Sequence, residues 1–282
     1  MKESESQTGT VHLRAVEVRK FKPWPERFPY TVPVIASLEA LAFSAPVTFF
    51  VGENGTGKST LLEALALSTG SITVGSAGTS KDKTLNPLRD LAHDFKLVWN
   101  KRTRKGFFMR SEDFFGYARA MDRTREEMQE YLDEVEQEYK NRSKLAQDYA
   151  RMAYAGQLHA MQNDYGDGVD ARSHGESYIK LFQNRFVPGG LYLLDEPEAP
   201  LSPRRQLAFL VLLAEMIKQQ AQFIIATHSP IILGFPGAAI LSCDSGRLEQ
   251  VRFDDLEHVL ITRDFLTHRK MYLKNLGLLE EE

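Results

Sequence analysis

Residues 52–60 constrain this chain more than any other stretch, because they read G-E-N-G-T-G-K-S-T and fit the pattern G-x-x-x-x-G-K-[ST]. The apolar, β-branched and aromatic run at 46–51 is typical of a buried parallel strand. The run at 61–67 consists of strong helix formers. Unpaired backbone N–H groups and the helix dipole favour a polyphosphate at such a strand-to-helix corner. A glycine-rich turn that matches by chance does not account for both flanks.

Each residue type in this motif has a physical role. Glycines let the backbone wrap closely around phosphates without Cβ clashes. We expect Lys58 to place its charge on the β- and γ-phosphates and Ser59 to offer its hydroxyl to Mg²⁺. The residues predicted to bind the phosphates are Gly52, Asn54, Gly55, Thr56, Gly57, Lys58, Ser59 and Thr60.

The composition is that of an ordinary globular protein. The 282 residues are 43% hydrophobic and 26% charged, which suits two domains or one large α/β domain with an insertion. A net charge of −3 gives no global attraction to nucleic acid or to an anionic membrane, and a local basic patch stays open. The single cysteine, Cys243, favours a reducing compartment, and no apolar run approaches the roughly 18 residues of a membrane helix. We therefore expect a cytoplasmic protein, or one part of a complex whose membrane portion lies in another chain, without direct membrane insertion.

Hydrophobic patterning predicts strands and helices along the whole chain. Expected strands are 11–20, 95–100, 106–110, 191–194, 223–226 and 239–242, and expected helices are 121–150 and 204–219. Residues 95–100 and 106–110 look like two strands joined by the basic turn 101–105, which is either a solvated hairpin tip or a nucleic-acid contact. In the proline-rich loop 22–33, Phe28 or Tyr30 either stacks on a base or packs beneath the loop.

Three further groups of polar residues point to phosphoryl chemistry. The apolar run 191–194 ends in Asp195 and Glu196, and we expect Asp195 to hold Mg²⁺ and Glu196 to take the proton of an attacking water. His228 follows the next expected strand, where it can donate to the γ-phosphate or orient the water. Ser173 can cap the helix 176–182, and a capped N-terminus is itself an anion site.

In order and spacing, these motifs resemble those of the ABC-type ATPases. Residues 52–60 look like Walker A, 173–176 like the signature, 191–197 like Walker B, and His228 like the switch histidine. The resemblance is closest to small soluble predicted ATPases of bacteria, relatives of the DNA-repair and chromosome-organising ATPases. It implies ATP and Mg²⁺ as ligands and a head-to-tail homodimer that closes on ATP.

The signature-like stretch departs from the family pattern. In the implied dimer, Ser173 and Gly175 contact the γ-phosphate held by the second subunit's phosphate loop, and Glu176 belongs to the same stretch. His174 stands where the family has a glycine, and Glu176 stands where it has a glutamine.

A second departure lies at 110–112. Arg110-Ser111-Glu112 replaces the family's glutamine after the second antiparallel strand, which makes Glu112 a candidate contact for Mg²⁺ or water. Together with Ser59 and Asp195, Glu112 completes the predicted metal site.

The sequence thus predicts an α/β P-loop NTPase fold of the ABC-ATPase type. It has a mostly parallel central sheet, N-terminal antiparallel strands and a helical insertion. Residues 1–110 and 178–282 form the expected nucleotide-binding core, and 111–177 form the insertion. The expected activity is ATP hydrolysis, with Glu196, His228 and Lys58 as catalytic residues. The alternatives are a nucleotide-gated module in repair or defence with a nucleic-acid or protein partner, and the ATP subunit of a membrane transporter.

Overall fold

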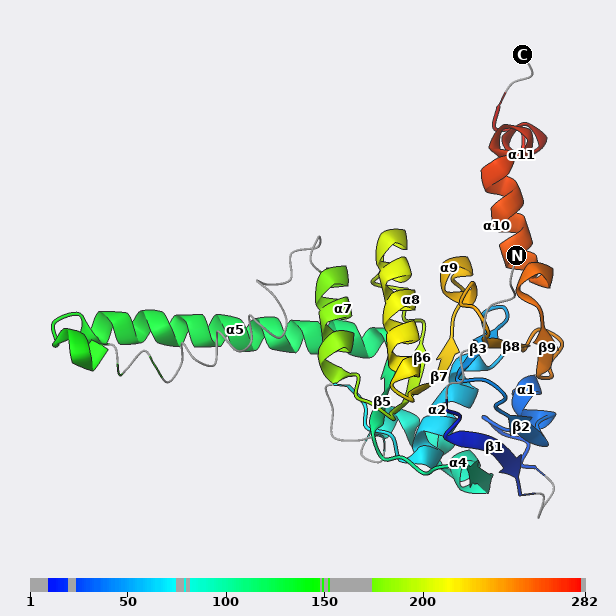
Figure 1. The fold of residues 1–282 in the computed structure, drawn as a ribbon, viewed down its shortest axis with the longest axis horizontal. Coiled ribbons are helices and arrows are strands. Elements are labelled where there is room, and N and C mark those ends of the chain that lie inside the picture. Colours follow the sequence, from blue (N-terminus) through cyan, green and yellow to red (C-terminus); the bar gives the residue numbers. More distant parts are fainter. Residues whose placement is uncertain are drawn as a thin grey trace.

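The computed structural model describes residues 10–19, 24–74, 82–147 and 174–279, together with residues 79, 149 and 152. Figure 1 shows its arrangement, with strands and helices in a layered body and two helical segments that extend from it. The strands are β1 (Leu13–Val18), β2 (Ala40–Ala42), β3 (Val47–Val51), β4 (Phe95–Trp99), β5 (Gly106–Arg110), β6 (Leu191–Asp195), β7 (Gln222–Ala226), β8 (Ala239–Ser242) and β9 (Glu249–Val251). The helices are α1 (Pro33–Ala36), α2 (Lys58–Thr69), η1 (Lys83–Leu88), α4 (Arg89–Asp94), α5 (Ser111–Tyr139), α7 (His174–Arg185), α8 (Pro203–Lys218), α9 (Pro230–Leu233), η2 (Phe253–Asp255), α10 (Glu257–Thr267) and α11 (Arg269–Asn275).

The central sheet has six strands in the order β5-β6-β7-β3-β8-β9. The neighbours β5 to β8 run parallel, and only the edge strand β9 runs antiparallel, against β8. The three strands at the centre are buried over their full length, as continuous apolar runs predict for a parallel sheet covered on both faces. The predicted α/β class and the mostly parallel sheet are confirmed.

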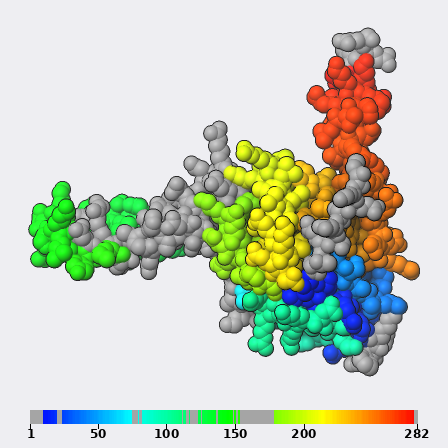
Figure 2. All heavy atoms as spheres, in the orientation of Figure 1, coloured from blue at the N-terminus to red at the C-terminus, as the bar shows by residue number. Residues whose placement is uncertain are grey.

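Alternation along the central strands sends side chains into two separate cores. In β3, Phe49 packs into the core formed with α7, α8 and α9, and Phe50 packs into the core formed with α1, α2 and α4. In β6, Tyr192 packs into the same core as Phe49, and Leu193 packs into the same core as Phe50. The phosphate-loop helix α2 and the helix α7 therefore cover opposite faces of the sheet. Figure 2 shows α7 and α8 side by side on the outside of their face.

A small antiparallel sheet, β2-β1-β4, confirms the expected N-terminal antiparallel strands. The predicted pairing of residues 95–100 with 106–110 is wrong, because β4 pairs with β1 whereas β5 joins the central sheet beside β6. Gly106 has φ of +111°, and a Cβ there would lie 1.8 Å from the carbonyl oxygen of Leu191. Thr103 also donates to the carbonyl of Gly189 (2.9 Å). The basic segment 101–105 is thus a crossover between two sheets, held against the start of β6.

Helix α5 begins at Ser111 and extends away from the sheet (Figure 1). At its N-terminus the Asp113 carboxylate accepts a hydrogen bond from the Arg110 backbone N–H (3.1 Å), which is one half of a capping box. The expected helix over 121–150 starts earlier and ends at Tyr139, and a further helical stretch follows at 144–147. Helix α7 returns the chain to the core, where Tyr178 is fully buried. The division into a core and an insertion at 111–177 stays a prediction.

The C-terminal part of the chain forms two helices, α10 and α11, with His268 between them. Both stand out from the body in Figure 2. In the part of the chain that the structure describes, no helix has the length and hydropathy to cross a membrane.

Candidate active site

The phosphate loop connects β3 to α2, as its flanking runs predict. Gly57 is the N-cap of α2 with φ of +101°, and a Cβ there would lie 2.5 Å from a methyl of Val32 and 2.7 Å from one of Val34. Only glycine fits this conformation and this space together. The N–H groups that begin α2 are left without side-chain caps, which is the condition for an anion site at a helix start.

Lys58 is buried, with its ammonium group inside the phosphate loop. Its Nζ donates to the carbonyl oxygens of Gly52 (2.7 Å) and Glu53 (2.9 Å). Burial lowers the pKa of Lys58, and the carboxylates of Glu196 and Asp195 act in the opposite direction. The cation is therefore held across the loop, next to the acidic end of β6.

Asp195 is the last residue of β6 and is only 8% exposed. The Ser59 hydroxyl lies near this carboxylate and favours its charged form, whereas Oδ1 has no hydrogen-bond partner among the described residues. Burial raises the pKa of Asp195 to about 7, and the nearby charges of Glu196 and Glu63 act in the same direction. A buried carboxylate with an unpaired oxygen beside a serine hydroxyl fits one divalent cation, and Mg²⁺ usually takes one or two carboxylates with phosphate oxygens. No group of three or more His, Cys, Asp or Glu side chains that could hold a metal occurs within the described ranges.

Glu196 turns away from the sheet at the first residue after β6. Its φ is +48°, a left-handed conformation that is uncommon for a residue with a side chain, and its N–H donates to Ala226 of β7 (2.9 Å). Its Oε1 lies 3.8 Å from Nε2 of His228, and the side chains of Glu196 and His228 are 43% and 37% exposed. Both side chains therefore reach solvent at the carboxyl edge of the sheet. The structure brings Lys58, Asp195, Glu196 and His228 together.

Burial lowers the pKa of His228, and the charge of Lys58 lowers it further. The imidazole is therefore neutral at pH 7. Its Nε2 atom is buried without a hydrogen-bond partner in the described part of the chain, on the side that faces Glu196. A neutral ring can either donate or accept a proton there, according to its tautomer.

Asp244 is a site residue that sequence reasoning missed. It follows β8, and its Oδ1 accepts a hydrogen bond from the backbone N–H of Glu53 (2.7 Å). The same oxygen would lie 2.9 Å from a Cβ on Gly52. The carboxylate of Asp244 thus fixes the first turn of the phosphate loop to the neighbouring strand. No motif marks it, although its position just beyond a central strand is a usable signal.

Arg110 occupies the place where the resemblance expects a glutamine. Its guanidinium, 12% exposed, forms ion pairs with Asp82 (2.9 Å), Glu63 (3.2 Å) and Asp113 (3.2 Å). Glu112 lies 3.5 Å from the Arg110 Nε and is 74% exposed. Within this group, Glu63 is the carboxylate whose charge raises the pKa of Asp195. The role of Glu112 as a metal ligand stays a prediction.

The signature-like stretch is described only in part. Ser173 lies outside the described residues, and Gly175 and Glu176 lie in the first turn of α7. Their predicted role in a partner's site stays a prediction.

The two candidate aromatics of the proline-rich loop differ in exposure. Tyr30 is 5% exposed, its ring lies edge-on to Trp24 at 5.0 Å, and its hydroxyl donates to Asp94 (2.7 Å). Tyr30 therefore packs beneath the loop, whereas Phe28 is 52% exposed.

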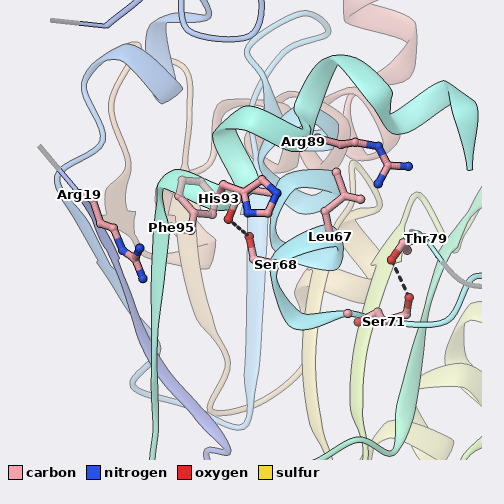
Figure 3. A pocket seen from close by; sticks show the side chains of 10 residues that line it. Arg19, Leu67, Ser68, Ser71, Thr79, Arg89, His93 and Phe95 are labelled. Carbon is pink, nitrogen blue, oxygen red and sulfur yellow. Dashed lines mark hydrogen bonds between the residues drawn. The ribbon is translucent and has the colours of Figure 1, made fainter. Parts of the chain in front are cut away.

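A separate hollow of about 450 Å³ lies at the far end of α2 (Figure 3). Arg19, Arg89 and His93 line it, yet Figure 3 shows Arg19 and Arg89 pointing in different directions. The Arg89 Nε donates to Asn86 (2.9 Å), and the Ser68 hydroxyl donates to the backbone carbonyls of Ala64 and Ala92. None of the residues expected to bind nucleotide lines this hollow.

Comparison with known proteins supports the P-loop assignment. Residues 32–163 match the family described as AAA domain. A comparison with curated proteins found no match.

Similar solved structures include three that span nearly the whole chain. The structure of cbiO1 from Clostridium perfringens, part of the ABC transporter complex cbiONQ, has 18% identity, covers 93% of this chain and 98% of its own, and has a TM-score of 0.45. The ADP conformation of an ATP-binding cassette of an ABC transporter has 14% identity, coverage of 95% and 100%, and a TM-score of 0.41. The Smc head domain from Pyrococcus furiosus, bound to the C-terminal domain of ScpA, has 10% identity, coverage of 89% and 99%, and a TM-score of 0.42. Similarity this distant assigns no activity or partner.

The family match contains the phosphate loop, and the strand order places the acids of β6 and His228 after β7 at the same sheet edge. Residues 32–163 therefore resemble an AAA domain, and the structure has the α/β fold with a mostly parallel central sheet that the motifs predict.

Proposed function

We propose that this protein is an Mg²⁺-dependent ATPase whose two copies close head to tail around ATP. The observation that carries the proposal is the pairing of a buried lysine with a buried, partly unsatisfied carboxylate. Lys58 spans the phosphate loop through two carbonyl contacts, and Asp195 keeps one oxygen without a partner among the described residues. Such a pair suits a polyphosphate together with a cation.

In this proposal the β- and γ-phosphates lie on the N–H groups at the start of α2, and Lys58 turns from the loop carbonyls to the phosphate oxygens. Asp195 and Ser59 would hold Mg²⁺, which neutralises charge on the phosphates. Glu196 accepts a proton from water as the water oxygen bonds to the γ-phosphorus. The bond between the γ-phosphorus and the bridging oxygen breaks, and ADP leaves.

His228 lies beside Glu196 and is suited to the same water or to a γ-phosphate oxygen. A neutral imidazole next to a carboxylate can orient a water molecule without competing for its proton. The large exposed fractions of Glu196 and His228 leave room for a second subunit to cover them.

The dimer is supported by where α2 and α7 lie. They pack into different cores on opposite faces of the sheet, so the start of α7 is better placed for a neighbouring copy than for its own phosphate loop. Gly175 would approach the γ-phosphate bound by the partner, and Ser173 and Glu176 belong to the same proposed contact.

The Glu196→Gln variant tests both parts of the proposal. It should bind ATP with Mg²⁺, fail to hydrolyse it, and elute as a dimer in size-exclusion chromatography under saturating ATP. The Lys58→Ala variant, which should not bind ATP, is the matched monomeric control. A Glu196→Gln protein that stays monomeric with ATP bound would exclude the dimer and leave the ATPase proposal to the turnover assay.

A second function, nucleic-acid binding, rests on the crossover 101–105. It carries four exposed cations, Lys101, Arg102, Arg104 and Lys105, and no acid. Helix α5, by contrast, contains ten acids and three arginines over Ser111–Tyr139, so it disfavours a phosphate backbone. ATP-dependent binding to DNA that weakens with salt, and that is lost when all four cations are changed to Ser, would support this role. Binding that is unaffected by these changes would exclude the crossover as the contact.

A further inference from the structure

The loop that carries His228 is fastened to the segment after β6 by a buried side chain. Glu198 lies in that segment, and its Oε1 accepts a hydrogen bond from the backbone N–H of His228 (2.8 Å). The other oxygen of the carboxylate, Oε2, has no hydrogen-bond partner among the described residues. Glu198 therefore holds this loop through the backbone N–H of His228.

A second side chain holds the same loop from α8. The Ser229 hydroxyl donates to Oε1 of Gln206 (2.6 Å), and Nε2 of Gln206 donates to the carbonyl of Leu201 (3.0 Å). The Ser229 hydroxyl also accepts from the N–H of Ile232 and thereby caps α9. Two side chains thus support the His228 loop, Glu198 from the segment after β6 and Gln206 from α8.

The loop held by these contacts carries an imidazole that lies close to the proposed proton acceptor. His228 Nε2 is 3.8 Å from Glu196 Oε1, and no described side chain hydrogen-bonds that nitrogen. The ring is therefore oriented through its backbone, which Glu198 anchors. Glu196 and Glu198 belong to the same short segment, so one segment positions both the carboxylate and the imidazole.

We propose that Glu198 is a positioning residue that sets the distance between His228 and Glu196 by holding the His228 backbone N–H. The proposal rests on the proposed ATPase function, since His228 and Glu196 matter through the water they share. Glu198 itself has no role on the nucleotide. The property that matters is a side-chain oxygen that reaches the His228 N–H. Without it His228 would move, and misplacing a catalytic group by about 1 Å costs on the order of 100-fold in rate.

The test compares three substitutions that separate length from charge. Glu198→Gln keeps an oxygen acceptor at the same reach and should retain kcat within about 3-fold, whereas Glu198→Asp keeps the charge, falls short of the N–H, and should lose about 10- to 100-fold. Glu198→Ala should lose as much as Glu198→Asp. ATP affinity should stay within about 3-fold in all three, since the phosphate loop is untouched. Glu215→Ala, an exposed position on α8, is the matched control with unchanged turnover.

A double-mutant cycle shows whether Glu198 acts through His228. If it does, Glu198→Asp combined with His228→Ala should have the same kcat as His228→Ala alone. Losses that multiply, or a Glu198→Asp enzyme with full kcat, would overturn the proposal.

An imidazole signal separates this proposal from the ATPase proposal. In ¹⁵N-edited NMR, the His228 ring is assigned by its disappearance in His228→Ala, and its pH titration should shift in Glu198→Asp but not in Glu198→Gln. This readout needs no hydrolysis. A wild-type protein without turnover would refute the ATPase proposal, and an unshifted ring in Glu198→Asp would refute the role of Glu198.

Discussion

Arg110 and Asp195 are register partners at the adjoining ends of β5 and β6. From this position Arg110 joins Glu63 of α2 to the first turn of α5, and Glu63 in turn acts on the charge of Asp195. This cluster, which stands where the resemblance expects a glutamine, therefore connects the start of α5 to the phosphate-loop helix α2.

Replacing Arg110 should strongly destabilise the folded protein. Arg110→Leu leaves Glu63, Asp82 and Asp113 close together, each less than 20% exposed, without their shared cation. We expect a loss of about 3–5 kcal/mol in the free energy of unfolding, measured by urea denaturation. Lys96→Ala, which breaks the exposed pair with Glu17, is the control and should cost about 0–1 kcal/mol. Equal losses in the two variants would contradict the prediction.

Lys58→Ala should abolish stabilisation by nucleotide. Saturating ATP with Mg²⁺ should raise the Tm of the wild type, because a ligand that binds only the folded state stabilises it by mass action. In Lys58→Ala the ammonium group inside the loop is gone, and the Tm should not respond to ATP. Chelation of Mg²⁺ should reduce the wild-type response. Lys218→Ala, at the end of α8, should respond like the wild type, and a Lys58→Ala protein that still responds fully would place the nucleotide elsewhere.

Asp195→Asn should stabilise the nucleotide-free protein at high pH only. Burial raises the pKa of Asp195 to about 7, above its ordinary value of 3.8, so the folded state binds this proton more tightly than the unfolded state. The contribution of Asp195 to stability is therefore fully present below about pH 4 and is lost as the pH rises through 7. Removing the charge should gain on the order of 4 kcal/mol at pH 8.5 and little at pH 4. Urea denaturation in a chelator at both pH values measures this, and an equal gain at both would contradict it.

Cys243 should be unreactive toward thiol reagents in the folded protein. The side chain is fully buried, and burial raises its pKa to about 12, so almost no thiolate forms at pH 8. Modification should follow global unfolding and should slow further with ATP bound. Labelling by a chromogenic disulfide with and without urea checks this, and rapid labelling of the native protein would show that the end of β8 opens locally.

Local patterns predicted the parts of this fold in which neighbouring residues determine the structure. The strands at 191–194, 223–226 and 239–242 and the helix at 204–219 follow from continuous apolar runs and helical spacing, and the structure has them within one or two residues. The phosphate loop followed from a motif whose glycines are needed for positive φ values. The hydrophobic patterns and the phosphate-loop motif both lie within the segments whose structure they specify.

Long-range pairing is what the sequence did not reveal. The runs at 95–100 and 106–110 look like a hairpin because the turn between them is short and basic. Their pairing in the structure, with β1 and with β6, shows that they belong to different sheets. Asp244, Glu63 and Glu198 were missed for a related reason. Each acts through a partner far away in the chain or through a backbone N–H, and no motif in the local sequence marks such a contact.

The backbone at Glu196 has one more consequence. Among the described residues, only Glu196 and Gln220 adopt positive φ without being glycine, and such a conformation costs about 1–3 kcal/mol. Selection for thermal stability alone would favour glycine or asparagine at position 196. Variants selected in this way would lack the proposed proton acceptor. An acid at this strained position is what a requirement for turnover, rather than for stability, would select.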